Sequence, residues 1–442
     1  MKVIRRASLI GVLILFSMMR VEAQEDENWK KEIERKIEVL TQELEKSNLG
    51  EVAEPIYEKK YGFAPAAAKV YHVNRGVSIG GYGEMVLQDW DSEQDNGAPA
   101  NRKSELDFLR AVLYVGYKFT DKILFNSEIE FEHASTSGGS SPRGEVSLEF
   151  AYLDFMISQP VGIRAGLLLM PTGIVNELHE PTLYHGARRP NVENDILPTT
   201  WRENGAGLFG EAGPFRYRTY VVTGLQAVDE STTSSNGIDG FKSSGIRNGR
   251  SKGAKSIAED WAWVGRVDFE GIPGTVIGAS VYSGNAGQDF TDSAGTTLDV
   301  SVDIWDVHGL CEYRGLEFRG LYAKTRINDV ARLNVKNGLG ASGTNSIGEQ
   351  QFGGYLELAY DVLSLIESKH YLAPFFRYER IDTQERVPAG YSKNPANSRT
   401  EYTYGLTYKP HPNTVIKADF TDVDNQAGTG IDKINAAVGY LF

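Results

Sequence analysis

Disulfide bonds cannot stabilise this chain, because its 442 residues include a single cysteine, Cys311. After residue 23 the sequence also lacks any run of about 18 or more apolar residues, the length that a membrane-spanning helix needs. These absences exclude a disulfide-rich scaffold and a helical membrane protein. The formal net charge of -13 argues against nucleic acid as a partner, since the phosphate backbone attracts basic proteins.

Sequence signs of catalysis and of metal binding are also scarce. No phosphate-binding G-x-x-x-x-G-K-[ST] motif occurs. His179, Glu180 and His185 lie close together, but a zinc protease needs histidines four residues apart on a helix. Here the two histidines are six residues apart, with Pro181 between them. We therefore expect no enzyme activity, no cofactor and no metal site, although catalytic residues on the rim of a barrel would leave no such spacing.

The first 23 residues have the pattern of a secretory signal peptide. Lys2, Arg5 and Arg6 precede the apolar stretch 9–19, and small residues stand before Gln24. Loss of this segment removes four positive charges and one negative charge, which takes the net charge from -13 to -16.

Residues 24–49 are rich in Glu and Lys and predict a short coiled-coil helix. Ile33, Ile37, Leu40 and Leu44 would form one apolar stripe along it. A solvated amphipathic helix is the alternative. Residues 50–75, which contain Pro55 and Pro65, are interpreted as a linker.

From Val77 onward the hydrophobic pattern has a period of two. In the segment "ILFNSEIEFE" the apolar residues Ile123, Phe125, Ile129 and Phe131 alternate with polar ones, which is typical of strands with one apolar face. About sixteen such segments occur, near 77–91, 104–119, 121–133, 144–158, 160–169, 205–213, 214–225, 259–270, 272–284, 300–314, 315–329, 350–361, 371–383, 398–409, 412–423 and 429–442. Tight turns alternate with long loops between them. The sequence thus predicts an all-β fold, a transmembrane antiparallel β-barrel of about 16 strands over residues 76–442. A soluble β-sandwich or β-helix is the alternative.

The final segment, "NAAVGYLF", supports closure of this barrel. Its strand would pair with the first strand so that no edge remains, and Tyr440 and Phe442 would face the lipid interface. A terminal Phe on such a strand also resembles the signal that outer-membrane assembly machinery recognises in its clients.

Several motifs together resemble the phosphate-selective porin O and P family. They are "GGYGE" in the first strand, "SEIEFEHA", the stretch "PTGIVNELHEP", and "PTTWRENGAGLFG" further on. The resemblance spans about residues 75–442 and implies a homotrimer of sixteen-stranded barrels, each with a long loop folded into its lumen. We place that loop at 171–204. The arginine rows and lysine cluster of the phosphate-specific members have no residue-by-residue match here.

Two interpretations of the charged residues in this loop remain open. They either tether the loop to the wall as ion pairs, or they form an eyelet in which Arg188 and Arg189 attract anions. The candidate constriction residues are Arg188, Arg189, Arg202, Glu177, Glu180 and Glu193. By parity, the candidate lumen-facing residues are Arg110, Arg164, Arg266, Arg319, Arg377, Glu128 and Glu130.

The function expected from this pattern is passive diffusion of small hydrophilic solutes or ions through an outer-membrane porin, with anions such as phosphate as one class. The N-terminal segment would lie in the periplasm of a Gram-negative-type bacterium, and membrane lipid would surround the barrel. A structural or adhesive barrel with a closed lumen is the alternative, and a barrel enzyme is a weaker one.

Overall fold

The computed structural model describes residues 58–135, 144–230, 237–340, 343–366 and 368–442, together with Lys31, Arg35, Lys36 and Glu38. The chain divides into two units, Met1–Ile56 and Tyr57–Phe442. In the first unit the four described residues are helical and exposed. The predicted signal peptide and the predicted apolar stripe Ile33, Ile37, Leu40 and Leu44 lie outside the described residues. No helix among the described residues is long and apolar enough to cross a membrane.

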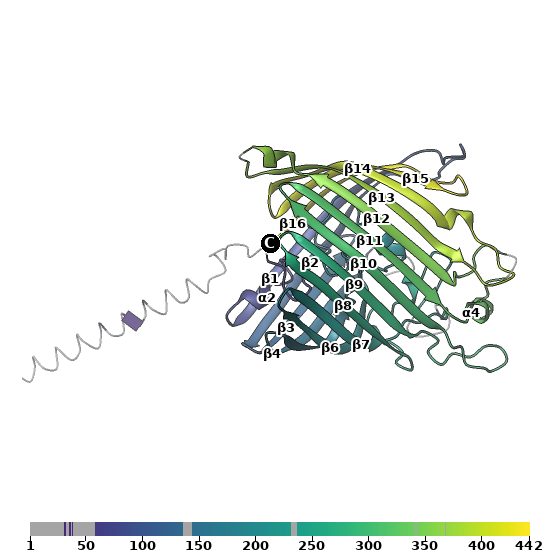
Figure 1. Cartoon of the computed structure of the whole chain (residues 1–442), viewed down its shortest axis with the longest axis horizontal. Coiled ribbons are helices and arrows are strands. Elements are labelled where there is room, and N and C mark those ends of the chain that lie inside the picture. Colours follow the sequence, from purple (N-terminus) through teal and green to yellow (C-terminus); the bar gives the residue numbers. More distant parts are fainter. Residues whose placement is uncertain are drawn as a thin grey trace, which may run out of the picture. The chain divides into compact units, whose positions relative to one another are not determined.

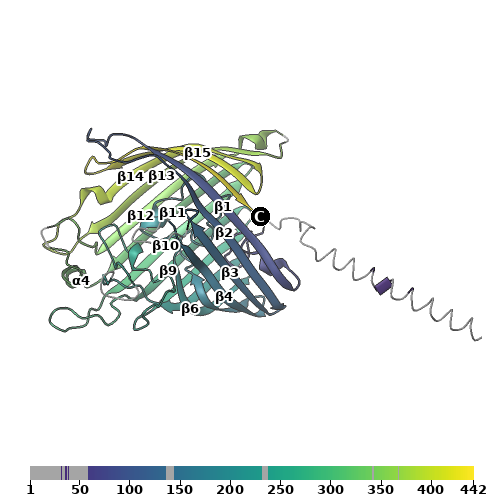
Figure 2. The same ribbon diagram turned by 180° about the vertical axis from the view of Figure 1, so that it is seen from behind.

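The second unit forms a closed antiparallel barrel, which confirms the predicted fold class. In the described part of the chain sixteen strands pair in sequence order, and β16 returns to pair with β1 (Figures 1 and 2). The strands are β1 (Gly76–Trp90), β2 (Glu105–Thr120), β3 (Ile123–Glu132), β4 (Val146–Ser158), β5 (Val161–Leu169), β6 (Arg202–Ala212), β7 (Phe215–Thr223), β8 (Trp261–Ile272), β9 (Thr275–Asn285), β10 (Ser301–Tyr313), β11 (Leu316–Ile327), β12 (Gln350–Tyr360), β13 (Tyr371–Arg386), β14 (Ser398–His411), β15 (Thr414–Asn425) and β16 (Lys433–Leu441).

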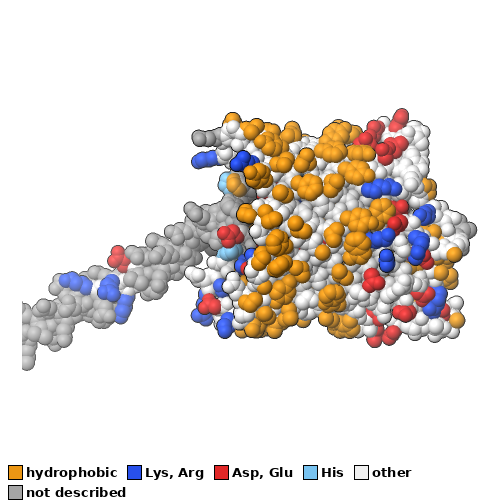
Figure 3. Space-filling view, viewed as in Figure 1, with side chains coloured by type: hydrophobic (Ala, Val, Ile, Leu, Met, Phe, Trp, Pro, Cys, Tyr) orange, Lys and Arg blue, Asp and Glu red, His pale blue; other side chains and the backbone are white. Residues whose placement is uncertain are grey.

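The alternation in the sequence corresponds to two faces of this barrel. On β2, Leu113 and Tyr117 are exposed, whereas Val112 and Tyr114, the two neighbours of Leu113, are buried. Figure 3 shows apolar side chains spread over the outer face of the strands, with charged side chains gathered at the end that carries α4 (Val330–Lys336). An apolar outer wall and a polar interior are the arrangement expected of a barrel in a membrane.

Connections alternate in length as the sequence predicts. At one end short turns join the strands, such as 121–122, 213–214 and 314–315. In the last of these Arg314 and Gly315 both have positive φ (49° and 82°), which suits a two-residue hairpin because its twist matches that of the strands. The other end carries long loops with short helices: α3 (Val192–Asp195), α4 and the 3-10 turns Arg247–Gly249 and Pro395–Asn397. One 3-10 turn, Val362–Leu365, instead lies between β12 and β13.

The carboxyl terminus closes the barrel. Phe442 exchanges two backbone hydrogen bonds with Gly81, at 2.9 and 3.0 Å. Tyr440 and Phe442 are 41% and 47% exposed, so both aromatic rings lie on the outer face. This position agrees with the lipid-facing orientation that we expect for them.

Residues 58–75 differ from the linker that the prolines suggested. Phe63 is 3% exposed and packs its ring on that of Tyr152 from β4, and Val70 in α2 (Lys69–His72) is 1% exposed. Asn126 of β3 donates a hydrogen bond to the carbonyl of Ala67. The run of alanines around Ala67 is small enough to lie against the inner wall, so this segment packs inside the barrel.

Candidate pore lumen

The connection between β5 and β6 crosses the interior of the barrel. Tyr184 donates a hydrogen bond to Glu84 of β1 (2.9 Å), and Gly173 donates one to Asp306 of β10 (3.1 Å). Further contacts reach β11 through His185, β13 through Val192 and β15 through Ala187. Because these strands lie around the barrel, the loop spans the lumen. It ends at Trp201, three residues before the predicted Asn204, since β6 begins at Arg202.

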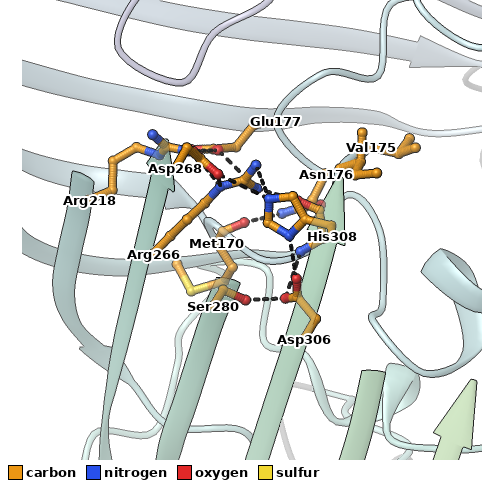
Figure 4. A network of polar contacts seen from close by, with 12 residues as sticks. Met170, Val175, Asn176, Glu177, Arg218, Arg266, Asp268, Ser280, Asp306 and His308 are labelled. Carbon is orange, nitrogen blue, oxygen red and sulfur yellow. Dashed lines mark hydrogen bonds and ion pairs between the residues drawn. The ribbon is translucent and has the colours of Figure 1, made fainter. Parts of the chain in front are cut away.

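Glu177 fixes one side of this loop in the polar network of Figure 4. Arg218 of β7 donates to Glu177 (2.7 Å) and to Asp268 of β8 (2.8 Å). Arg266 pairs with Asp268 at 2.8 Å and donates to the carbonyl of Gly173. All of these side chains are about 5% exposed or less. Glu177 therefore pairs with the wall arginines and not with the arginines of its own loop.

Two further loop glutamates accept hydrogen bonds from backbone groups. Glu180 accepts from the amides of Ala66 (2.9 Å) and Ala67 (3.1 Å), which connects the loop to residues 58–75. Burial raises the pKa of Glu180 to about 7, although these amides and His179 lower it. Glu193 accepts from Ile174 and Val175 within the loop and from Tyr355 of β12 at 2.6 Å. Both carboxyl groups thus hold the loop in its position.

His179 and His185 lie in separate environments, as their spacing implies. The Nε2 atom of His179 lies 3.1 Å from Glu128 of β3 and 3.6 Å from Glu149 of β4. Burial disfavours the charged imidazole, but the neighbouring Glu128 carboxylate raises the pKa of His179 above its ordinary value. His185 instead faces Glu317 of β11 at 3.1 Å.

Arg188 and Arg189 border an internal cavity. This cavity of about 240 Å³ is lined by Arg110, Arg188, Arg189 and Arg247, with Glu84 and Tyr184 among its other lining residues. Arg189 donates to the carbonyl of His179 (3.2 Å) and to the hydroxyl of Thr199 (3.4 Å). Arg188 is exposed, and among the described residues no carboxylate lies within 4.0 Å of its guanidinium group. The two arginines are therefore available to a solute in the cavity.

The arginines expected in the lumen lie on the inner wall, each with a carboxylate partner. The side chain of Arg319 is 12% exposed, and the others are buried. Arg110 pairs with Glu84 (2.8 Å) and Glu130 (3.2 Å). Arg202, predicted in the constriction loop, instead begins β6 on the wall and pairs with Glu149 (3.4 Å). The remaining pairs are Arg164 with Asp154, Arg319 with Glu317 and Glu357, and Arg377 with Glu357 and Glu379.

Sequence reasoning missed several of these partners. Glu84, Asp154 and Asp268 lie on inward-facing positions that strict alternation would have identified. Glu149 could not be found in this way, because Phe150 beside it is also buried.

The sequence matches the serine hydrolase motif G-x-S-x-G at Gly76–Gly80. In a hydrolase this motif forms a strand-to-helix turn that exposes the serine, but here it lies within β1, so Ser78 is not placed as a nucleophile.

Similar folds occur among solved outer-membrane proteins. OmpF of Salmonella typhi, solved with daunomycin, is 12% identical to this chain and has a TM-score of 0.52. The match covers 84% of this chain and 98% of the OmpF chain. An anion-selective porin from Comamonas acidovorans is 12% identical, covers 83% and 99%, and has a TM-score of 0.50. At such identity the likeness shows the fold alone, which is that of a porin-type barrel.

At the sequence level, no protein-family model matches the chain. A protein of Aquifex aeolicus (strain VF5), described as uncharacterized, is 35% identical over 397 residues, which are 89% of this chain and 86% of that protein. The chain belongs to the family of this Aquifex aeolicus protein. Membership of the phosphate-selective porin O and P family stays a prediction.

Proposed function

We propose that this protein is an outer-membrane porin that conducts small hydrophilic solutes, with a preference for anions set by Arg188 and Arg189. The observation that carries this proposal is the cavity inside the barrel, which both arginines border and where Arg188 has no carboxylate partner within the described residues. A guanidinium group in a narrow, partly desolvated passage attracts anions several-fold more strongly than in bulk water. Phosphate is one anion that fits this chemistry.

The location and the oligomeric state belong to the same proposal. The exposed apolar residues of the strands favour a barrel in the outer membrane, where Tyr440 and Phe442 would form part of the assembly signal. We further propose a homotrimer, as the family resemblance implies, with the N-terminal segment in the periplasm. Crosslinking of the barrel in detergent, followed by electrophoresis without heating, tests the trimer: a monomer alone would contradict it.

Reversal potentials in a salt gradient test the selectivity. Replacing both arginines, Arg188→Glu with Arg189→Glu, reverses two charges at the cavity, so the preference for anions should fall or invert at low salt. The difference should shrink at 1 M salt, where screening acts over about 3 Å. Arg386→Glu is the matched control, because Arg386 is 62% exposed and lies where β13 meets its long loop. An unchanged reversal potential in the double variant would contradict the proposal.

A barrel with a closed lumen is the second candidate. The observation that favours it is the double filling of the interior, by the loop and by residues 58–75, which hydrogen-bond to each other through Glu180. Such a barrel would give no stepwise currents in a planar bilayer. Absence of currents from wild-type protein that is folded and inserted would favour this candidate over the porin.

A further inference from the structure

Three metal-ligating side chains from separate parts of the chain meet beside the loop. They are Glu128 of β3, Glu149 of β4 and His179 of the loop, and one ligand atom of each lies within 4.8 Å of the other two. The exposed fractions of these residues are 0%, 0% and 2%. A buried group of two carboxylates and one imidazole is therefore built where the loop contacts the wall.

An irregularity in the sheet aims Glu149 into this group. In the pairing of β3 with β4, Glu128 lies opposite Phe150, and the next residue, Ile129, lies opposite Leu148. The register therefore skips Glu149, which has no partner on β3. As a result Glu149 and Phe150 are both buried, although neighbouring strand residues normally face opposite sides. Bulges of this kind re-aim a side chain and are common beside functional sites.

The ring of His179 has a fixed orientation. Its Nδ1 atom lies 2.8 Å from the carbonyl oxygen of Asn176, which can only accept, so Nδ1 carries a hydrogen. The Nε2 atom then faces Glu128 and Glu149, and it holds either a second proton or a cation. Histidines that bind metals usually donate their other N–H to a carbonyl or a carboxylate in this way.

Unpartnered carboxylate oxygens in this group point to a cation. Within the described residues, Oε2 of Glu128 and Oε2 of Glu149 are buried without a hydrogen-bond partner, and the latter is the atom 3.6 Å from Nε2 of His179. Carboxylate contacts join this group into a network with two arginines. The network contains the carboxylates of Glu84, Glu128, Glu130 and Glu149 and the guanidinium groups of Arg110 and Arg202. A divalent cation beside Nε2 of His179 would give both of these unpartnered oxygens a partner.

We propose that Glu128, Glu149 and His179 bind a divalent first-row transition metal ion, which fastens the loop to β3 and β4. One imidazole and two carboxylates suit Zn²⁺ or Mn²⁺ better than Ca²⁺ or Mg²⁺, which prefer oxygen ligands alone. Zn²⁺ with ligands at about 2.0–2.2 Å holds them roughly 3–4 Å apart, close to the spacing seen here. The proposal does not depend on conduction through the lumen.

Zinc binding to the whole barrel tests this site. Protein stripped with EDTA receives Zn²⁺ either after folding or during refolding in detergent, and bound zinc is counted after gel filtration. We expect about one zinc per chain in the wild type and at least about tenfold weaker binding in His179→Gln and Glu149→Gln. His185→Gln is the matched control, because His185 is an equally buried loop histidine that faces one carboxylate, and it should bind zinc like the wild type.

Two results would overturn the proposal. One is wild-type protein without zinc under both conditions, which leaves a proton on Nε2 of His179. The other is equal binding in the wild type and in folded His179→Gln, which shows adventitious binding by surface carboxylates. If the variants fail to fold, zinc-edge X-ray absorption of the wild type decides, since it must show one imidazole and otherwise oxygen ligands.

Discussion

The acidic and the basic residues of the loop between β5 and β6 are held in different ways. Glu177, Glu180 and Glu193 are each buried, and each accepts hydrogen bonds from partners on the wall, in residues 58–75 or in the loop itself. Arg188 is exposed and borders the cavity, and within the described part of the chain the hydrogen bonds of Arg189 go to a carbonyl and a hydroxyl group.

This difference separates two roles within one loop. Carboxyl groups with buried partners set the position of a segment, because removing one partner leaves the other polar or charged group buried and unpaired. Charges that face a cavity without such partners can act on a solute. The glutamates therefore position the loop, and under the proposed function the two arginines are the residues that a permeating ion would meet.

The largest effect should come from removing a wall partner of Glu177. Arg266→Met leaves Asp268 and Glu177 with one fewer guanidinium and removes the contact to Gly173. We expect a loss of about 3–5 kcal/mol in the free energy of unfolding, measured by urea titration in detergent micelles. The control Arg216→Met, at a side chain that is 29% exposed, should lose less than about 1 kcal/mol. Equal losses in both variants would contradict a positioning role for this network.

The pKa of Glu180 gives a prediction on pH. Its folded value of about 7 lies above its ordinary value of 4.5, so the folded protein holds this proton more tightly than the unfolded chain. Stability from this group is present below pH 4.5 and is lost as the pH rises to 7, by up to roughly 3 kcal/mol. Glu180→Gln should remove that loss, so the variant gains relative to the wild type between pH 4.5 and 8 in thermal unfolding. A constant difference across this range would contradict the prediction.

Alternation in the sequence predicted the barrel well, because each strand has one lipid-type face and one polar face. β12, predicted at 350–361, is found at Gln350–Tyr360. The predicted start of β6, at residue 205, was less accurate. The strand begins at Arg202, because Arg202, Glu203 and Asn204 belong to it although a polar run of this kind resembles a loop. Strand identity is a local property, so the local pattern suffices for it.

The interior could not be predicted in the same way. Glu177 belongs with Arg218 and Arg266 only because the loop folds back onto β7 and β8, a contact that no local pattern encodes. The linker predicted at 50–75 contains Pro55 and Pro65, yet Phe63 and the alanines around Ala67 pack inside the barrel. Which side chains pair inside the lumen depends on how the closed barrel brings distant segments together. The inward orientation of Glu149 at the β-bulge depends on strand pairing in the same way.

A smaller loss of stability should follow from removing one of the hydrogen bonds that Glu193 accepts. Tyr355→Phe removes the hydroxyl that donates to Glu193 at 2.6 Å, and hydrogen bonds to charged groups contribute about 1.5–3 kcal/mol. The loss should appear in the same urea titration. Tyr378→Phe is the matched control, since the ring of Tyr378 packs on Tyr402 from the next strand and should lose less than about 0.5 kcal/mol. If the two variants lose the same stability, Glu193 is not held through Tyr355.

The smallest effects on stability should come from the two arginines themselves. Arg189→Gln gives up hydrogen bonds to His179 and Thr199 and should cost about 1 kcal/mol, whereas Arg188→Gln, at an exposed side chain without a carboxylate partner, should cost less than about 0.5 kcal/mol. Both variants should nevertheless lower the preference for anions at low salt, because each removes one positive charge from the cavity.

A small change in the unfolding curve together with a clear change in reversal potential distinguishes residues that face the solute from residues that position the loop. If Arg188→Gln destabilises the barrel as much as Tyr355→Phe does, Arg188 belongs with the glutamates as a structural contact.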